Sequence, residues 1–181
     1  SEVERAAEES KRLNKTIRDE NREVLREIRD LIRRMKEENR RMVKRVDEVL
    51  KEIRELFRRD KIDKLVEELL RRVRDIIRRD HERVRRVLER IERLIRKDHE
   101  RVRRVLKEDE RLIRELEKKR TDEKVREILE RLERESRKTA KELDESNREA
   151  EELLKRVADE AKKSNETLRE RLERLAREAE K

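Results

Sequence analysis

Apolar residues recur with the period of an α-helix along almost the whole chain. From Val3 to Phe57 they stand mostly three or four positions apart, as expected for one apolar stripe on a helix. When the apolar positions are shifted by eighteen residues, they coincide with other apolar positions of the same stripe. Ala6, Val24 and Met42 therefore share one place in the repeat. Eighteen residues make five turns at about 3.6 residues per turn. The pattern therefore predicts nearly straight helices, without the supercoil that a heptad repeat imposes.

The same repeat is visible as letters in the middle of the chain. DHERVRRVL occurs at residues 80–88 and again at residues 98–106. It places the only two histidines, His81 and His99, at matching points. Their rings should project from one side of a helix, about 27 Å apart along its axis. We expect both histidines to lie in or beside an otherwise apolar stripe.

The apolar pattern breaks twice, at RRDKIDKL (residues 58–65) and at KKRTDEKV (residues 118–125). Asp60 is a candidate N-cap after the first break and Thr121 after the second. We therefore expect helices at about residues 2–59, 61–119 and 122–180, each with one narrow apolar stripe. Such stripes are buried when they face a common axis. The predicted fold is all-α: an antiparallel three-helix bundle of long, nearly straight helices, forming a single domain over residues 1–181.

Polar residues inside the stripes predict which levels of the helices meet. In an antiparallel pair, residues at one level have position numbers with a constant total, set by the turn. Asn21 with His99 and Asn39 with His81 share such a total, which places the turn near residue 60. His99 and His81 match Asn147 and Asn165 in the same way, with a turn near residue 123.

These matches predict three buried polar layers. The first layer contains Asn21, His99, Ser146 and Asn147, and either Ser146 or Asn147 could face the core. The second layer contains Asn39, His81, Ser164 and Asn165, with the same choice between Ser164 and Asn165. The third layer contains Ser10, Asn14, Asp109 and Ser136, with Thr139 as a further candidate.

The layers suit a neutral histidine, because asparagine and serine offer both donors and acceptors to the two ring nitrogens. A buried polar group without a partner costs about 1–3 kcal/mol, so the layers would disfavour misaligned helices. The first interpretation is that they only set register. The alternative is a pH response: burial disfavours imidazolium, so protonation of His81 and His99 would destabilise the fold in acid. Asp80 and Asp98 could turn inward and oppose this effect.

The amino-acid composition limits the possible classes of protein. The chain has 181 residues, of which 60% are charged, and it contains no Gly, Pro, Cys, Trp or Tyr. Without turn-forming residues most β architectures are excluded. High charge often indicates disorder, but the strict apolar register and the Glu, Lys and Arg content favour helices. We find no membrane-length apolar run and no signal peptide, so no membrane is expected as a partner and the localisation is unknown.

The net charge and the candidate catalytic or metal-binding residues point to no specific function. The formal net charge is +9, but Glu alternates with Arg as on a solvated helix face. Without aromatic stacking residues we expect no specific nucleic-acid partner, only weak, salt-sensitive binding to polyanions. One histidine per layer and no Ser–His–acid group predict neither enzyme, metal nor cofactor. We expect a monomer that requires no partner, although a homo-oligomer could use the same stripes.

The eighteen-residue repeat, the near-equal helices, the short turns and the paired Asn21/His99 and Asn39/His81 levels resemble computationally designed helical bundles with buried hydrogen-bond networks. The resemblance implies a structural scaffold without a natural function. The histidine layers are also similar to those of designed pH-responsive bundles. Those designs are typically oligomers of helical hairpins, so for this chain the resemblance implies unfolding rather than disassembly in acid. A natural-type coiled-coil interaction rod is a further alternative, but we find no strip reserved for a partner.

Overall fold

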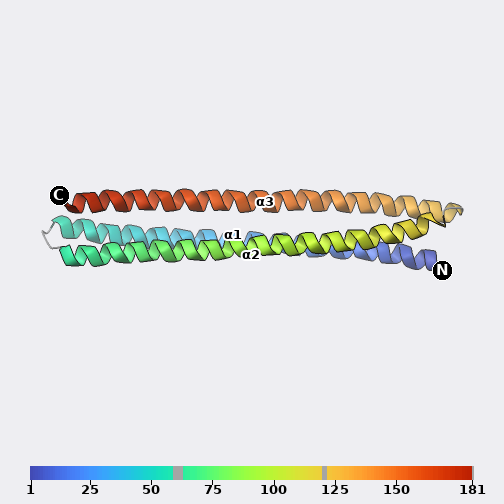
Figure 1. Cartoon of the computed structure of the whole chain (residues 1–181), viewed down its shortest axis with the longest axis horizontal. Helices are drawn as coiled ribbons and strands as arrows, with labels where there is room; N and C mark the ends of the chain where they lie inside the picture. Colours follow the sequence, from blue (N-terminus) through green and yellow to red (C-terminus); the bar gives the residue numbers. More distant parts are fainter. Residues whose placement is uncertain (59–62, 120–121, 181) are drawn as a thin grey trace. The chain divides into compact units, whose positions relative to one another are not determined.

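The computed structural model describes residues 1–58, 63–119 and 122–180, and these residues form three α-helices without any strand (Figure 1). Helix α1 spans Glu2–Arg58, α2 spans Asp63–Glu117 and α3 spans Glu123–Glu180. The prediction of an all-α fold with three long helices is confirmed, and the helix ends lie within a few residues of the expected ones.

Two helix starts have a side chain that accepts a backbone hydrogen bond. At α1 the amide of Glu4 donates to the Ser1 hydroxyl, at 3.3 Å. At α3 the amide of Lys124 donates to Oδ1 of Asp122, also at 3.3 Å. Such caps satisfy amides that have no partner inside the helix. The predicted caps Asp60 and Thr121 lie outside the described residues.

Contacts divide the chain into two compact units, each built from one segment of every helix. The first unit is Ser1–Arg29 with Glu92–Leu153, and the second unit is Asp30–Ile91 with Leu154–Lys181. The expectations of a single domain and of nearly straight helices stay predictions.

In the first unit, cross-helix contacts give the direction of each segment. Lys119 Nζ donates to Glu2 Oε2 at 2.7 Å and Arg101 Nη1 to Glu20 Oε2 at 2.8 Å, so α1 and α2 run antiparallel. Arg18 faces Glu142 at 3.5 Å, and the α1–α3 pair runs parallel. The apolar core of this unit includes two clusters of buried residues: Ala7, Leu116, Leu129 and Leu132, and then Ile17, Val102 and Leu143.

In the second unit, α1 and α2 are again joined by an ion pair, Glu38 with Arg83 at 3.1 Å, and α1 and α3 by Asp47 with Arg171 at 3.3 Å. The core includes a large apolar cluster. It contains Met42, Val46, Val49, Leu50, Ile53, Val66, Leu70, Val73, Ile77, Leu168, Leu172 and Leu175. All three helices contribute to it, as expected when each narrow stripe turns toward the other two.

Two leucines of the second unit provide a test of this core. Leu168 is 3% exposed and Leu65 is 50% exposed. We expect Leu168→Ala to lower the free energy of unfolding by about 2–5 kcal/mol, because it removes buried methyl groups and leaves a cavity. The matched variant Leu65→Ala should change it by no more than about 0.5 kcal/mol. Chemical denaturation of both variants measures the difference, and similar losses would contradict this core.

Candidate functional site

The third layer is built around Asp109, which is 1% exposed. The hydroxyl of Ser10 on α1 donates to Oδ1 of this carboxylate, and the hydroxyl of Ser136 on α3 donates to Oδ2. Asn14 is also buried; its amide nitrogen donates to the Ser10 carbonyl at 2.9 Å, and its Oδ1 is enclosed without a hydrogen-bond partner. One carboxylate on α2 therefore binds both neighbouring helices.

Thr139 is fully buried, but it belongs to a different contact. Its hydroxyl accepts a hydrogen bond from Nε of Arg18 at 2.8 Å, and the same guanidinium donates to the Glu135 carbonyl at 3.4 Å. Arg18 is half-buried. Sequence reasoning missed it, because nothing in the pattern separates it from the other cations among the 59 Lys and Arg residues.

The first layer comes together around a cavity of about 10 Å³, whose polar lining is Asn21, Asp98, Ser146 and Asn147. The amide nitrogen of Asn21 donates to Oδ2 of Asp98 at 2.6 Å, and Asp98 is 2% exposed. Oδ1 of Asp98 is enclosed without a partner. Ser146 and Asn147 are both half-buried and both line the cavity, so the layer contains both residues and not only one of them.

His99 does not take the predicted place in that layer. It is half-buried and does not line the cavity, and its Nε2 is enclosed without a hydrogen-bond partner. The partner of Asn21 is Asp98, one residue before the expected His99.

The second layer lines another cavity of about 10 Å³. Its polar lining consists of Asn39, Asp80, His81, Ser164 and Asn165. Asn39, Ser164 and Asn165 are half-buried. The buried member is Asp80, whose Oδ1 accepts from Arg83 Nη2 at 2.8 Å.

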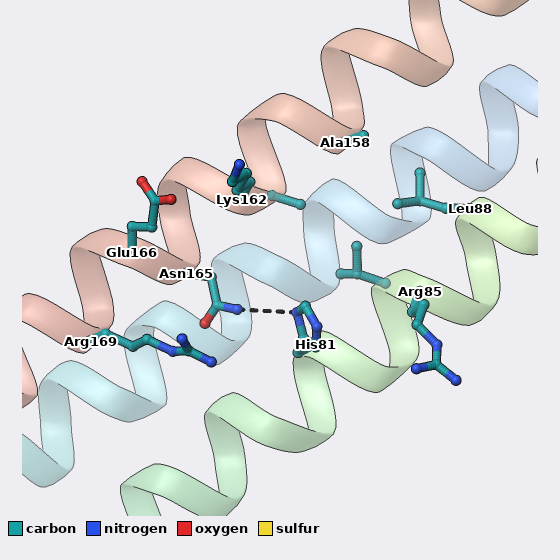
Figure 2. A pocket seen from close by; sticks show the side chains of 10 residues that line it. His81, Arg85, Leu88, Ala158, Lys162, Asn165, Glu166 and Arg169 are labelled. Carbon is teal, nitrogen blue, oxygen red and sulfur yellow. Dashed lines mark hydrogen bonds between the residues drawn. The ribbon is translucent and has the colours of Figure 1, made fainter.

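The prediction that His81 is buried is wrong, because its side chain is exposed. Its Nδ1 lies 3.1 Å from the amide nitrogen of Asn165, so it joins α2 to α3 at the edge of the layer (Figure 2).

Both histidines lie away from their predicted places because α2 is rotated about its axis relative to the predicted orientation. The rotation corresponds to one residue, about 100°. Asp98 follows Ile95 by three positions and precedes Val102 by four, which is the spacing of neighbours on one helix face. Asp80 has the same relation to Ile77 and Val84. The aspartates thus occupy the middle of the apolar stripe and the histidines its edge. This signal was present in the sequence.

Burial raises the pKa of Asp98 above its ordinary value. The hydrogen bond from Asn21 and the charges of Arg101 and His99 act in the opposite direction, while Glu20 adds to the increase. A carboxyl whose pKa is higher in the folded chain favours folding when it is protonated. That contribution is complete below the unfolded value of about 3.9 and is lost as the pH rises through the folded value.

The described part of the chain offers little support for metal binding or for a membrane-spanning helix. No group of three or more His, Cys, Asp or Glu side chains there could hold a metal ion. None of the described helices combines the length and the apolar character needed to cross a membrane. Among the polar groups identified above, the buried carboxyl of Asp98 is the candidate for a proton-linked role.

No protein-family model matches the sequence, and no curated protein matches it. A solved structure described as a "Computationally designed three helix bundle" is similar over 99% of this chain and 93% of that chain, with 20% identical residues and a TM-score of 0.49.

The hydroxyl groups around Asp109 provide the first test of the site. Ser10→Ala removes a donor to a buried carboxylate, so it should lower the free energy of unfolding by about 1.5–3 kcal/mol. Thr16 is an exposed residue of the same helix, and Thr16→Ala removes a hydroxyl without that loss. Chemical denaturation compares the two variants. Equal stability of both would show that the Ser10 hydroxyl contributes nothing.

Asp98 provides a pH test. Between about pH 4 and pH 7, the parent should lose stability that Asp98→Asn retains, because only the parent has a buried carboxyl that ionises. The difference in unfolding free energy, variant minus parent, should therefore rise with pH. The control is Asp144→Asn, which changes an exposed aspartate of α3. Denaturation at several pH values measures both differences, and the same trend for the two variants would refute the role of Asp98.

Proposed function

We propose that this chain is a designed structural scaffold whose buried polar side chains select one register of its helices. The common spacing of the polar residues supports the designed origin, and the Asp109 cluster, which stands outside that spacing, supports the selection of one register. Asn21 and Asn39 on α1, and Asp98 and Asp80 on α2, are eighteen residues apart. The pairs Ser146–Asn147 and Ser164–Asn165 on α3 have the same separation, and each set lines its own small cavity.

Ion pairs at the helix edges repeat with the same period, which supports the proposal. Glu20 with Arg101 in the first unit corresponds to Glu38 with Arg83 in the second unit. Each pair lies beside one polar layer. Exposed ion pairs contribute little stability, about 0–1 kcal/mol each, but like charges at these places would disfavour a misaligned pair.

A repeat of this kind creates a problem that the polar residues can solve. A slide of α2 along α1 by eighteen residues, with the turn re-formed about nine residues further along the chain, would bring apolar side chains back onto apolar side chains, and Asn39 would then face Asp98. The third layer breaks the symmetry, because Asp109 is only eleven residues from Asp98. After the slide Asp109 would face Ile28, which is 1% exposed, instead of Ser10. A buried carboxylate without donors costs several kcal/mol, so the shifted register is penalised.

The designed origin is supported by the sequence itself. The repeat continues without Gly or Pro, and its polar members follow the same period as its apolar ones. The resemblance to designed bundles with buried networks points to the same origin. Under this proposal the protein has no natural substrate, and its purpose is a defined fold.

A pH response is a second candidate, favoured by the burial of Asp98 and the enclosed Nε2 of His99. In this version the response comes from the first layer, because Asp98 is buried whereas His81 is exposed. Protonation of Asp98 would favour folding in acid, which is opposite in sign to the effect expected for a buried histidine.

The register proposal is tested by making the third layer apolar. In the triple variant Ser10→Ala, Asp109→Leu, Ser136→Ala, we expect the chain to remain helical and to populate the shifted register. Cysteine pairs report the register: Glu20→Cys with Arg101→Cys marks the native one, and Glu38→Cys with Arg101→Cys the shifted one. In the native register Glu38 faces Arg83, which is about 27 Å from Arg101 along the helix.

With a short bifunctional thiol cross-linker, the expected result is a cross-link between positions 38 and 101 only in the triple variant, while the parent background forms only the cross-link between positions 20 and 101. The two registers differ by about 27 Å along the helix, which exceeds the reach of such a cross-linker, so the assay separates them. Cross-linking restricted to the native pair in both backgrounds would contradict register selection by the third layer.

A further inference from the structure

A groove of about 420 Å³ opens between α2 and α3 of the second unit (Figure 2). Its apolar lining consists of Val84, Leu88, Ala158 and Ala161. Two of these are alanines on α3, whose short side chains leave space opposite Val84 and Leu88. The volume lies within the range of roughly 300–1,000 Å³ that is typical of small-molecule sites.

The groove continues on the other side of His81. A second hollow of about 280 Å³ is lined by Ile77, Leu172 and the same His81, Asn165 and Arg169, together with Arg74 and Arg78. From residue 74 to residue 88, the two hollows extend for about 21 Å along α2. The residues common to both hollows are polar, so the groove has a polar middle and an apolar stretch on each side.

The rim of the groove is strongly positive. Arg74, Lys162 and Arg169 are exposed, and none of them forms an ion pair with a described residue. Arg78 and Arg85 also line it, although each pairs with an acid of its own helix, Asp75 and Glu89.

Glu166 is the acidic residue of the lining. Among the described lining residues of the two hollows, Arg74, Lys162 and Arg169 therefore lie beside the apolar surface together with one carboxylate, Glu166.

His81 adds a directed donor to this arrangement. Because the Asn165 amide nitrogen can only donate, Nδ1 of His81 acts as the acceptor of their 3.1 Å contact. The proton of the neutral ring is then on Nε2, which can donate to an anion. Arg169 from α3 lines the same middle part of the groove, so the two side chains provide donors from both helices.

We propose that this groove binds an anionic amphiphile with a single alkyl chain, such as a fatty acid. The carboxylate is held by Arg169 and by Nε2 of His81, where a charged guanidinium gives a short, strong hydrogen bond. The alkyl chain lies along Val84, Leu88, Ala158 and Ala161 and removes their surface from water. Lys162 adds positive charge at the edge of the same hollow.

Two other occupants fit less well. A second copy of this chain would bring its own net charge of +9 toward the positive rim. A helix of an acidic partner is about 10–12 Å wide and needs a continuous apolar seam. The polar pair of His81 and Asn165 interrupts that seam in the middle of the groove.

Dodecanoate below its micellar concentration is the probe, and the two histidines make its binding visible by NMR. His81 lines the groove, while His99 belongs to the first unit and does not. We expect the imidazole proton signals of His81 to shift in a saturable way and those of His99 to stay constant. His99→Asn assigns the two sets. Calorimetry of the same titration gives the affinity.

Variants separate the head group from the tail. Arg169→Glu should weaken dodecanoate binding by about tenfold or more, because it replaces attraction by repulsion. Its matched control is Arg174→Glu, which reverses an exposed charge of α3 outside the groove. Ala161→Leu should abolish binding by filling the apolar stretch, whereas Ala140→Leu, at an exposed alanine of α3, should not. Circular dichroism verifies that each variant is folded, and Lys162→Glu provides a second charge variant.

Several results would overturn the proposal. Equal weakening by Arg169→Glu and Arg174→Glu would mean attraction to the overall basic surface. Equal binding of dodecyltrimethylammonium would remove the carboxylate from the recognition. Equal shifts of the His81 and His99 signals would mean that the groove is not the site. A dimer in light scattering that dodecanoate dissociates would assign the groove to self-association instead.

Discussion

Three carboxylates in the core of α2 constrain the rest of the structure. Asp80, Asp98 and Asp109 are all nearly inaccessible to solvent. An ionised carboxylate in such a place costs several kcal/mol unless donors surround it. Asp109 receives hydroxyl groups from α1 and α3, and Asp98 receives an amide from α1. The neighbouring helices must therefore stand at the levels where these donors reach.

Apolar burial and polar pairing have separate roles here. The apolar stripes provide the driving force for packing, but their eighteen-residue repeat makes several alignments nearly equivalent for them. The layers around Asp98 and Asp80 share that repeat. They therefore cannot distinguish two alignments of the helices that differ by eighteen residues. The group of Ser10, Asp109 and Ser136 stands outside the repeat. Under the register proposal, this single irregular cluster is sufficient to make one alignment different from the others.

The helices, their ends and the pairing of levels could be predicted from the sequence, because they depend on periodicity and on the position of the breaks. The predicted orientation of α2 about its own axis was wrong by one residue. The matching repeat positions and the shared totals with Asn21 and Asn39 favour the two histidines as the buried groups, although Asp98 stands between Ile95 and Val102 and is the better candidate by spacing. The groove beside His81 could not be predicted. It depends on short side chains at Ala158 and Ala161 meeting α2 at one level, which requires the register and rotation of both helices.

The central claim is that Asp98 and not His99 completes the layer with Asn21. Double-mutant cycles in chemical denaturation test it directly, with Asn21→Ala combined once with Asp98→Ala and once with His99→Ala. We predict a coupling free energy of about 0.5–3 kcal/mol for Asn21 with Asp98, as for residues in one hydrogen-bonded network, and almost none for Asn21 with His99. Coupling to His99 and none to Asp98 would contradict the account.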